Sequence, residues 1–403
     1  MSLLSKLKDA FGGGFSGASS SPKDYGRNFD VKINIGSKEI KNDKAVAITG
    51  IMVDSGMPPE AGVCEVHMKV LAYSLTANDE LKINDDFAQI KIAQPLKIEV
   101  SNSGSKGITK EYSTIFTGFV ERIESEIESS GAVNFVVHGM DAKMWMMANK
   151  LTESRGIGKS YEQVIKSVIK NYSSQGKTGK ISLLKNIQLK STFYQVDQSD
   201  YEFLSMMSDL TGSLFYVDPD GKFNFCAPSK LMKPMNTIAL KNEVVLGIKF
   251  SASVWGTPQS VKVTSIDPSN PSRVISATSN SASSIGSGKS PKQVVPQNCS
   301  SLSSGIRCVN ITDNSVENKE QAQARADAEY NRRNLKFVET ELLIEGNPKI
   351  CTGQGVNLEG FGAPFNNEYL VARVVHLCGT FSDDSFYVTK LYMAANKFTP
   401  QRG

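Results

Sequence analysis

Apolar and polar residues alternate along much of this chain, with the two-residue period of β-strands. The alternation starts at Phe29, where FDVKINIG places Val31, Ile33 and Ile35 on one face. Further segments rich in β-forming residues follow: AVAITGIMV, AGVCEVHMKVL, DFAQIKIAQPLKIEV, STIFTGFVERIESEI and AVNFVVHGM. The last two form a pair with a turn at 129–131. About six strands separated by turn signals predict a barrel or a sandwich.

The period then changes to that of helices. The segment KSYEQVIKSVIKNY carries one apolar helical stripe, and Ser160 with Gln163 has the spacing of a capping box. A second helix is predicted to begin at Ser199 and to end at Gly212, a residue suited to a helix C-terminus. With the hairpin SLFYVDPDGKFNFC that follows, residues 156–235 indicate a small mixed α/β domain.

Strand patterns return from about residue 236, interrupted by a Ser-rich stretch that we expect to be a loop. A helix is predicted over 317–336, and its alanines favour close packing on a sheet. The chain then continues with FVETELLIEG, GQGVNLEGF, EYLVARVVHLCGTF and SFYVTKLYMAAN. The last pair resembles STIFTGFVERIESEI and its partner, which suggests two related barrels.

The predicted fold class is mainly β with a smaller α/β part: two related β-barrel, tube-like domains and a mixed domain between them. We expect a flexible Gly/Ser-rich N-terminal segment at 1–28 and a first β-barrel domain at 29–155. The middle mixed domain is placed at 156–235. The second β-barrel domain is placed at 236–403, with the Ser-rich loop at 266–304.

Composition narrows the classes of function. The 403 residues include 45 Lys and Arg against 41 Asp and Glu, a net charge of +4. A protein that binds nucleic acid through its phosphates normally has a strong basic excess, so neither general nor sequence-specific nucleic-acid binding is expected. No apolar run is long enough for a membrane span, and the N-terminus lacks a signal-peptide pattern. We expect the protein to be made and kept in a cytoplasm until assembly.

Cysteine and histidine give no metal-binding pattern. None of the six cysteines forms a C-x-x-C pair, and buried free thiols are predicted for a chain without a secretion signal. His67, His138 and His376 each lie in an alternating strand, where packing or hydrogen bonding is the common role. A glycine-rich patch at 353–362 opens into strands and predicts turns, not a phosphate-binding loop. No metal or cofactor site is predicted.

Carboxylates and aromatic residues form no pattern that predicts a catalytic or nucleic-acid-binding site. Two acids suffice for a glycosidase, but the cluster Glu121, Glu124, Glu126 and Glu128 is typical of a solvated strand face. Acids at 197–202 suit a helix N-terminus. No serine has a G-x-S-x-G setting. Aromatic residues alternate on the hairpin without interleaved basic residues, which favours a core face. No catalytic residue is predicted.

The segment FYQVDQSDYEFLSMMSDLTGSLFYVDPDGKFNF resembles hub proteins of contractile tails. The positions that carry this likeness are Tyr194, Gln195, Ser199, Asp200, Phe203, Leu204, Gly212, Phe215 and Phe223. HGMDAKMW, SVKVTSIDP and the C-terminal third from GNPKICTGQG are similar to other parts of the same family. The likeness covers roughly residues 29–398. The family includes late-control protein D of temperate phages and the hub part of VgrG-type spike proteins.

The resemblance implies a homotrimer in which two barrels per chain form a pseudo-sixfold ring. Such a ring is a structural, non-enzymatic baseplate hub. It joins a sixfold tail tube to a threefold central spike. Its location is a virion tail or an equivalent injection particle. The implied partners are a separate spike protein, the tail tube protein, baseplate wedge proteins and a tape measure protein. A phage tail, a bacteriocin and a secretion machine are not distinguished.

Two surfaces have an expected role. The C-terminal residues Asn396, Lys397, Phe398, Thr399 and Pro400 are expected to face the spike, because relatives with a fused spike continue from there. The channel face is expected to be near-neutral or acidic, so that DNA passes without binding. Two alternative functions remain open, a tail-associated peptidoglycan hydrolase and an all-β adhesin or carbohydrate-binding module.

Overall fold

A computed structural model of the chain describes residues 29–40, 46–57, 61–70, 74–75, 81–82, 90–102, 111–128, 132–156, 158–189, 192–233, 235–267, 269–298, 307–381 and 384–400. The turn expected at 129–131 and the segment 1–28 lie outside these residues. The fold is mainly β with a smaller helical part, as the sequence predicts.

The first β part is a curled antiparallel sheet in which each strand presents alternate residues to one core. Its strands are β1 (Phe29–Ile35), β2 (Lys38–Ile40), β3 (Val46–Gly56), β4 (Val63–Val70), β7 (Pro95–Asn102), β8 (Ser113–Ile127) and β9 (Val133–Met140). The short strands β5 (Ser74–Leu75) and β6 (Leu81–Lys82) pair only with each other among the described strands. The core includes Ile33, Val66, Ile98 and Val137, none of which has exposed surface.

The second β part has its own core around Val338, Val356, Tyr369 and Leu391. Its strands are β15 (Met235–Ala239), β16 (Val245–Ala252), β20 (Val338–Glu345), β21 (Gly355–Glu359), β22 (Glu368–Phe381) and β23 (Asp384–Ala395). Tight turns at Gly353, Gly360 and Gly362 have positive φ values, so the glycine-rich patch forms turns as predicted.

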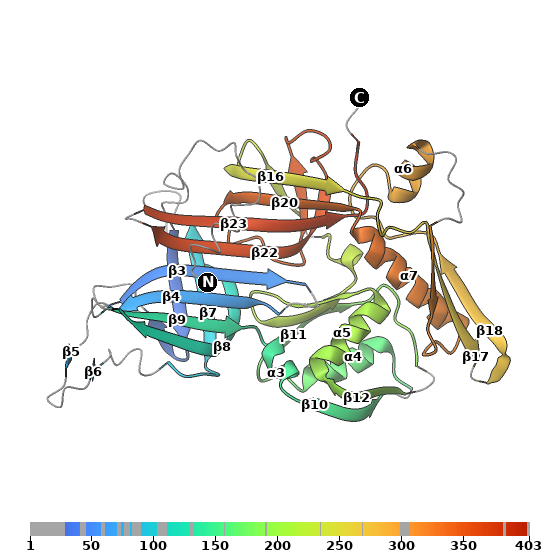
Figure 1. The fold of residues 1–403 in the computed structure, drawn as a ribbon, viewed down its shortest axis with the longest axis horizontal. Coiled ribbons are helices and arrows are strands. Elements are labelled where there is room, and N and C mark those ends of the chain that lie inside the picture. The colour runs from blue at the N-terminus through green and yellow to red at the C-terminus, as the bar shows by residue number, and fades with distance from the viewer. Residues whose placement is uncertain are drawn as a thin grey trace.

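One sheet joins the two parts. Strand β22 pairs antiparallel with β3 from Arg373↔Gly56 to Gly379↔Gly50. The result is a 13-stranded sheet whose longest path runs β16-β20-β23-β22-β3-β4-β9-β8-β7-β1-β2. Figure 1 shows β16, β20, β23 and β22 following β3, β4, β9 and β8 in one continuous stack. Segments more than 300 residues apart in sequence therefore form a single wall.

The mixed domain packs below this wall in Figure 1. It contains α3 (Lys143–Met147), β10 (Lys150–Arg155), α4 (Tyr161–Lys170), β11 (Lys177–Ser182), β12 (Phe193–Ser199), α5 (Asp200–Thr211), β13 (Leu214–Val217), β14 (Lys222–Cys226) and the 3-10 helix η2 (Pro228–Lys230). The predicted capping box of α4 is present, α5 begins with a second capping box formed by Ser199 and Glu202, and Gly212 ends α5 with a φ of 62°. Phe215, Phe223 and Phe225 are fully buried, so the hairpin aromatics form the predicted core face.

A smaller layer projects from the second β part, at the right of Figure 1. It comprises β17 (Ser260–Asp267), β18 (Asn270–Ser279), α6 (Pro291–Asn298), β19 (Cys308–Thr312) and α7 (Lys319–Leu335). Buried Ala322 and Ala326 of α7 pack against Val261 and Val263 of β17, which confirms the prediction of close alanine packing.

The Ser-rich segment 266–304 differs from the prediction. We expected a loop, but β18 occupies Asn270–Ser279 and α6 occupies Pro291–Asn298. The physical reason is that Ile275 and Ala277 alternate with the exposed residues Val274, Ser276 and Thr278, so the two apolar side chains pack against α7. A Ser-rich composition therefore concealed a strand of period two.

Candidate assembly surfaces

The face of the sheet opposite the first core is covered by paired charges. Arg122 Nη1 on β8 lies 2.6 Å from Glu124 Oε1, and Glu124 Oε2 lies 3.4 Å from His138 Nε2 on β9. Glu65 on β4 is shared between His138 at 3.8 Å and His67 at 3.3 Å. Two of the three histidines thus lie in one network of polar side-chain contacts that crosses three strands.

The acidic cluster considered as a glycosidase pair lies on this same open face. Glu121 and Glu124 are exposed and pair with Arg122, and Glu128 pairs with Lys69 at 2.9 Å. Because these carboxylates face solvent and each has a cation beside it, the solvated-face interpretation is confirmed for them.

Charged residues also lie on this face in the second β part, where they border a buried apolar cluster of Leu343, Val375, Leu377, Phe386 and Val388. Arg373 on β22 donates from Nε and Nη2 to the two carboxylate oxygens of Asp54 on β3, at 2.8 and 2.5 Å. The Arg373 guanidinium also lies 5.2 Å from the centre of the Tyr392 ring. The Glu341 carboxylate on β20 forms ion pairs with Lys390 Nζ at 3.2 Å and with Lys249 Nζ at 3.7 Å.

Carboxylates outnumber cations among the charged residues that surround the apolar cluster on this face. Strand pairing places on it the acids Asp54, Glu65, Glu124, Glu126, Glu128, Glu339, Glu341 and Glu345 and the bases Lys69, Arg122, Lys249, Arg373 and Lys390. We name this set the charged wall. Its acidic balance contrasts with the net charge of +4 of the whole chain.

The third histidine lies on the other side of the sheet. His376 is 3% exposed, and its Nδ1 lies 3.1 Å from the Tyr387 hydroxyl and 3.2 Å from Thr389 Oγ1. Burial lowers the pKa of His376 to about 4, so its ring is neutral at physiological pH. Within the described ranges, no group of three or more histidine, cysteine or acidic side chains could hold a metal ion.

The C-terminal residues proposed from sequence as a spike contact are largely used within the chain. Asn396 is buried, and its side chain bonds Ser283 O at 2.7 Å and Ile285 N at 2.9 Å. Lys397 O accepts a hydrogen bond from Asn367. Phe398 packs 5.4 Å from the ring of Phe337. Of the five residues, Thr399 is the exposed one.

Sequence reasoning missed a buried polar network at the start of α5. Asp200 is 2% exposed and accepts hydrogen bonds from Arg155 at 2.8 Å, Tyr172 at 2.9 Å and Gln195 at 3.1 Å. The sequence indicated only a carboxylate that suits a helix N-terminus. Its partners lie up to 45 residues away, and no local spacing points to them. Glu202 does have the predicted capping role, and its hydrogen bonds with Ser199 lower its pKa.

Cysteine placement agrees in part with the prediction of buried free thiols. Cys64, Cys226 and Cys378 are buried and free, Cys351 is half-buried and Cys308 is exposed. Burial raises the pKa of the Cys226 thiol to about 11. Cys299 lies outside the described residues.

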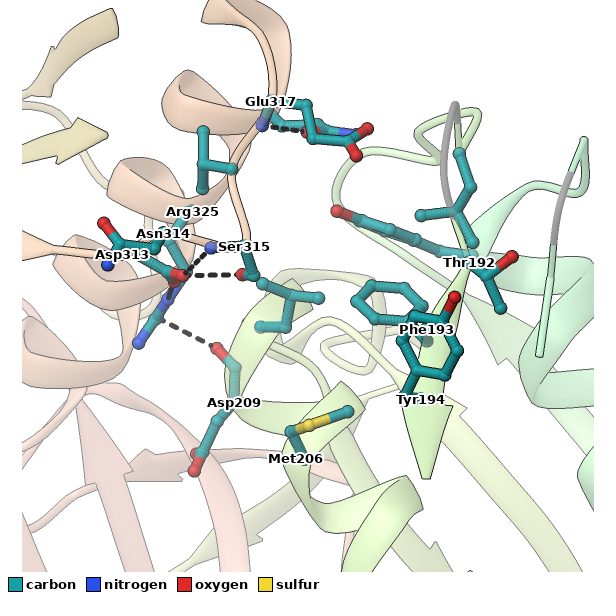
Figure 2. Close-up of a pocket in the computed structure, with 15 residues that line it drawn as sticks. Thr192, Phe193, Tyr194, Met206, Asp209, Asp313, Asn314, Ser315, Glu317 and Arg325 are labelled. Carbon is teal, nitrogen blue, oxygen red and sulfur yellow. Dashed lines mark hydrogen bonds and ion pairs between the residues drawn. The ribbon is translucent and has the colours of Figure 1, made fainter. Parts of the chain in front are cut away.

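A pocket of about 710 Å³ lies between β12, α5 and the segment that leads into α7 (Figure 2). Arg325 crosses its polar side, donating to Asp209 O at 3.2 Å and pairing with Asp313 at 3.4 Å. Glu317 lies at the rim, and its Oε2 is buried without a hydrogen-bond partner. An unpartnered buried carboxylate oxygen is a feature that a donor from another molecule would satisfy.

Among the described helices, none is long and apolar enough to cross a membrane.

The family model that matches the chain is not that of the contractile-tail hub proteins that the sequence resembles, whereas solved structures of tail proteins share its fold. A family model described as Alg8 N-terminal domain matches residues 97–379, more than half of the chain. No curated protein matches the chain in sequence.

Solved structures match over nearly the whole chain. A 43 kDa tail protein of prophage MuSo2 from Shewanella oneidensis has a TM-score of 0.62 at 14% identity, over 92% of this chain and 99% of that one. A tail protein from Neisseria meningitidis MC58 has a TM-score of 0.63 at 10% identity, over 92% and 97%. The E. coli c3393 protein, described as a component of the type VI secretion system, has a TM-score of 0.53 at 10% identity, over 92% and 79%. At these identities the likeness shows a common fold.

Proposed function

We propose that this chain, which belongs to the family described as Alg8 N-terminal domain, is a structural baseplate hub of a contractile injection system. This family description does not point to a tail. The support for the hub role is the fold that the chain shares with tail proteins. In this proposal the chain joins a sixfold tail tube to a threefold spike and acts through surfaces, without catalysis.

The observation that carries the proposal is the continuous sheet. Two curled β parts with separate cores are joined edge to edge through β3 and β22, so one chain supplies two adjacent segments of a wall. Three such chains would supply six segments, which is how a threefold assembly can match a sixfold tube. A homotrimer with pseudo-sixfold symmetry is part of the proposal, and the two joined β parts support it.

The charged wall is proposed as the channel side. Its excess of carboxylates would repel the phosphates of passing DNA, and its ion pairs keep the local field moderate. The spike-facing role is proposed for the end of the C-terminal segment, where Thr399 is exposed and Pro400 is half-buried. The tail tube, wedge and tape measure proteins are proposed as further partners, in a virion tail or an equivalent particle.

The native mass of the purified full chain tests the proposal, measured over a range of concentrations by sedimentation. Three times 43.8 kDa gives about 131 kDa for the expected trimer. Electron microscopy of that species should show a ring with six similar lobes. A chain that stays at the monomer mass at every concentration, both alone and mixed with the spike protein from the same particle, would contradict the proposed assembly.

A further inference from the structure

The turn between β16 and β17 presents an unusual side chain. Trp255 is 91% exposed, and it is one of only two tryptophans in the chain. Its neighbour Val254 is also exposed, at 42%. Tryptophan is the residue most enriched among the contacts that dominate binding energy, because its ring buries a large apolar area with few rotatable bonds.

The backbone below Trp255 is held in place by several hydrogen bonds. Arg307 Nη2 donates to Val254 O at 3.1 Å and to both oxygens of Thr257. Thr257 Oγ1 donates to Val254 O at 2.7 Å, and Ser253 N donates to Phe337 O at 2.9 Å. Because the turn is already ordered, little conformational entropy would be lost when the indole ring is buried by a partner.

The pocket of Figure 2 has a lining and a volume that suit a tryptophan side chain. Tyr161, Phe193, Met206 and Leu210 give it an apolar and aromatic lining. Its volume of about 710 Å³ leaves room for an indole ring and an adjoining side chain. The buried Glu317 Oε2 has no hydrogen-bond partner, and the Trp255 indole N–H is a donor that a solvent-exposed ring can offer.

The turn and the pocket lie at opposite ends of α7. The pocket includes Gln321 and Arg325 near the start of the helix, whereas the turn bonds to Phe337, just past its end. At 1.5 Å per residue the 17 residues of α7 separate them by about 25 Å, so the two cannot meet within one copy. A contact between them in two copies uses a different surface on each copy, and such a head-to-tail contact forms a ring when the rotation between copies closes.

Charge also favours this contact. The exposed cation Lys336 lies beside the turn, since Ser253 bonds the residue that follows it. The pocket carries the side chains of Asp209, Asp313 and Glu317 against the single cation Arg325 among its lining residues. A basic approach to an acidic rim steers the two surfaces together.

We propose that Trp255 of one copy inserts into the pocket between β12, α5 and α7 of a second copy. The inference rests on the proposed self-association and specifies one of its contacts. Its bonding partner in the pocket is Glu317, and the turn at 253–257 acts as the rigid anchor.

Fluorescence of a Trp145→Phe chain tests the inference, because Trp255 is then the only tryptophan. As concentration rises and the oligomer forms, the emission of Trp255 should shift to shorter wavelength and its quenching by iodide should fall several-fold. An oligomer in which Trp255 stays fully quenchable would overturn the inference and leave the hub proposal intact. A chain that never associates would contradict both.

Matched variants locate the contact on each copy. Trp255→Ala should weaken association about 10-fold or more, whereas Val274→Ala, which truncates a 67% exposed residue on β18, should leave it unchanged. Asn314→Trp fills the pocket and should weaken association to a similar degree. Asn310→Trp, which adds the same ring on β19 outside the pocket, is its control. Equal effects of Asn314→Trp and Asn310→Trp would rule out the pocket as the acceptor.

Discussion

At the residue scale, the protonation state of a buried polar group affects the stability of the fold. His376 is the clearest case, because it lies on β22, the strand that joins the two β parts. Its Nδ1 is next to the hydroxyls of Tyr387 and Thr389, which can donate only while the ring remains neutral at that nitrogen. Protonation in the folded state would place a charge in the core.

The stability of the chain should therefore fall as the pH falls from about 6.5 to about 4. In this range an unfolded chain binds a proton at residue 376, with a pKa near 6.5, whereas the folded chain with a pKa of about 4 does not. At pH 5 the free energy of unfolding should be about 2 kcal/mol lower than at pH 7.5 because of this residue alone. Urea unfolding of the wild type and of His376→Gln at both pH values measures it.

The variant should lose this part of the pH dependence. A His138→Gln chain, which keeps His376, serves as the control and should retain the wild-type difference. If His376→Gln and the wild type lost the same free energy between pH 7.5 and pH 5, the buried histidine would not be the source.

Local residue roles were predictable from sequence where their cause is local. Ser160, Ser199 and Gly212 have their predicted roles because a cap depends on residues three or four positions away. The burial of Asp200 was not predictable in the same way. It depends on Arg155 and Tyr172, which strand β10 and helix α4 bring together only in the folded domain.

At the element scale, helix α7 lies between the mixed domain and the projecting β17–β18–β19 sheet. Its alanines pack on that sheet, and Ala328 meets Gly212 at the C-terminus of α5. A Cβ at residue 212 would lie 2.7 Å from Ala328 Cα, so the two helices are as close as a glycine allows. Gly212 therefore both ends a helix and admits a second one.

Replacement of Gly212 by alanine should destabilise the chain by about 3 kcal/mol, from about 1 kcal/mol of left-handed strain and about 2 kcal/mol of overpacking. Gly158 is the matched control, since its φ is 69° and no atom lies within 4 Å of its Cβ position. Gly158→Ala should cost only the strain, about 1 kcal/mol. Chemical denaturation of both variants gives the difference, and equal losses would show that α5 and α7 separate easily.

Element types were predictable wherever apolar residues kept a clear period. Helix 317–336 and the aromatic hairpin were found in this way. Strand β18 was missed because its inward residues are small and its outward residues are mostly serine and threonine. The Ser-rich composition of the segment predicted a loop, although its apolar residues have the two-residue period of a strand. The pairing of Ile275 with Ser265, and its contact with α7, could not be read from the segment itself.

At the scale of the whole molecule, the two β parts are one sheet. The sequence indicated two similar barrels, but not the β3–β22 pairing between them, because such long-range register depends on no local signal. The pocket and the charged wall were unpredictable for the same reason. Each gathers residues from strands and helices that are more than 100 residues apart.

A shared sheet should make the two β parts unfold together. Amide N–H groups at the centres of β3 and β22 donate to carbonyl oxygens of the other strand, so neither part can open without breaking the junction. We expect hydrogen exchange, followed by mass spectrometry in increasing denaturant, to show both strands exchanging through one global opening with the same free energy. The β17–β18–β19 sheet is the internal control, since it forms a separate sheet covered by α7 and should open at lower free energy. Protection of β22 under conditions in which β3 exchanges freely would show that the wall is two independent domains in contact, and it would remove the main support for a single chain acting as two rigid segments of a ring.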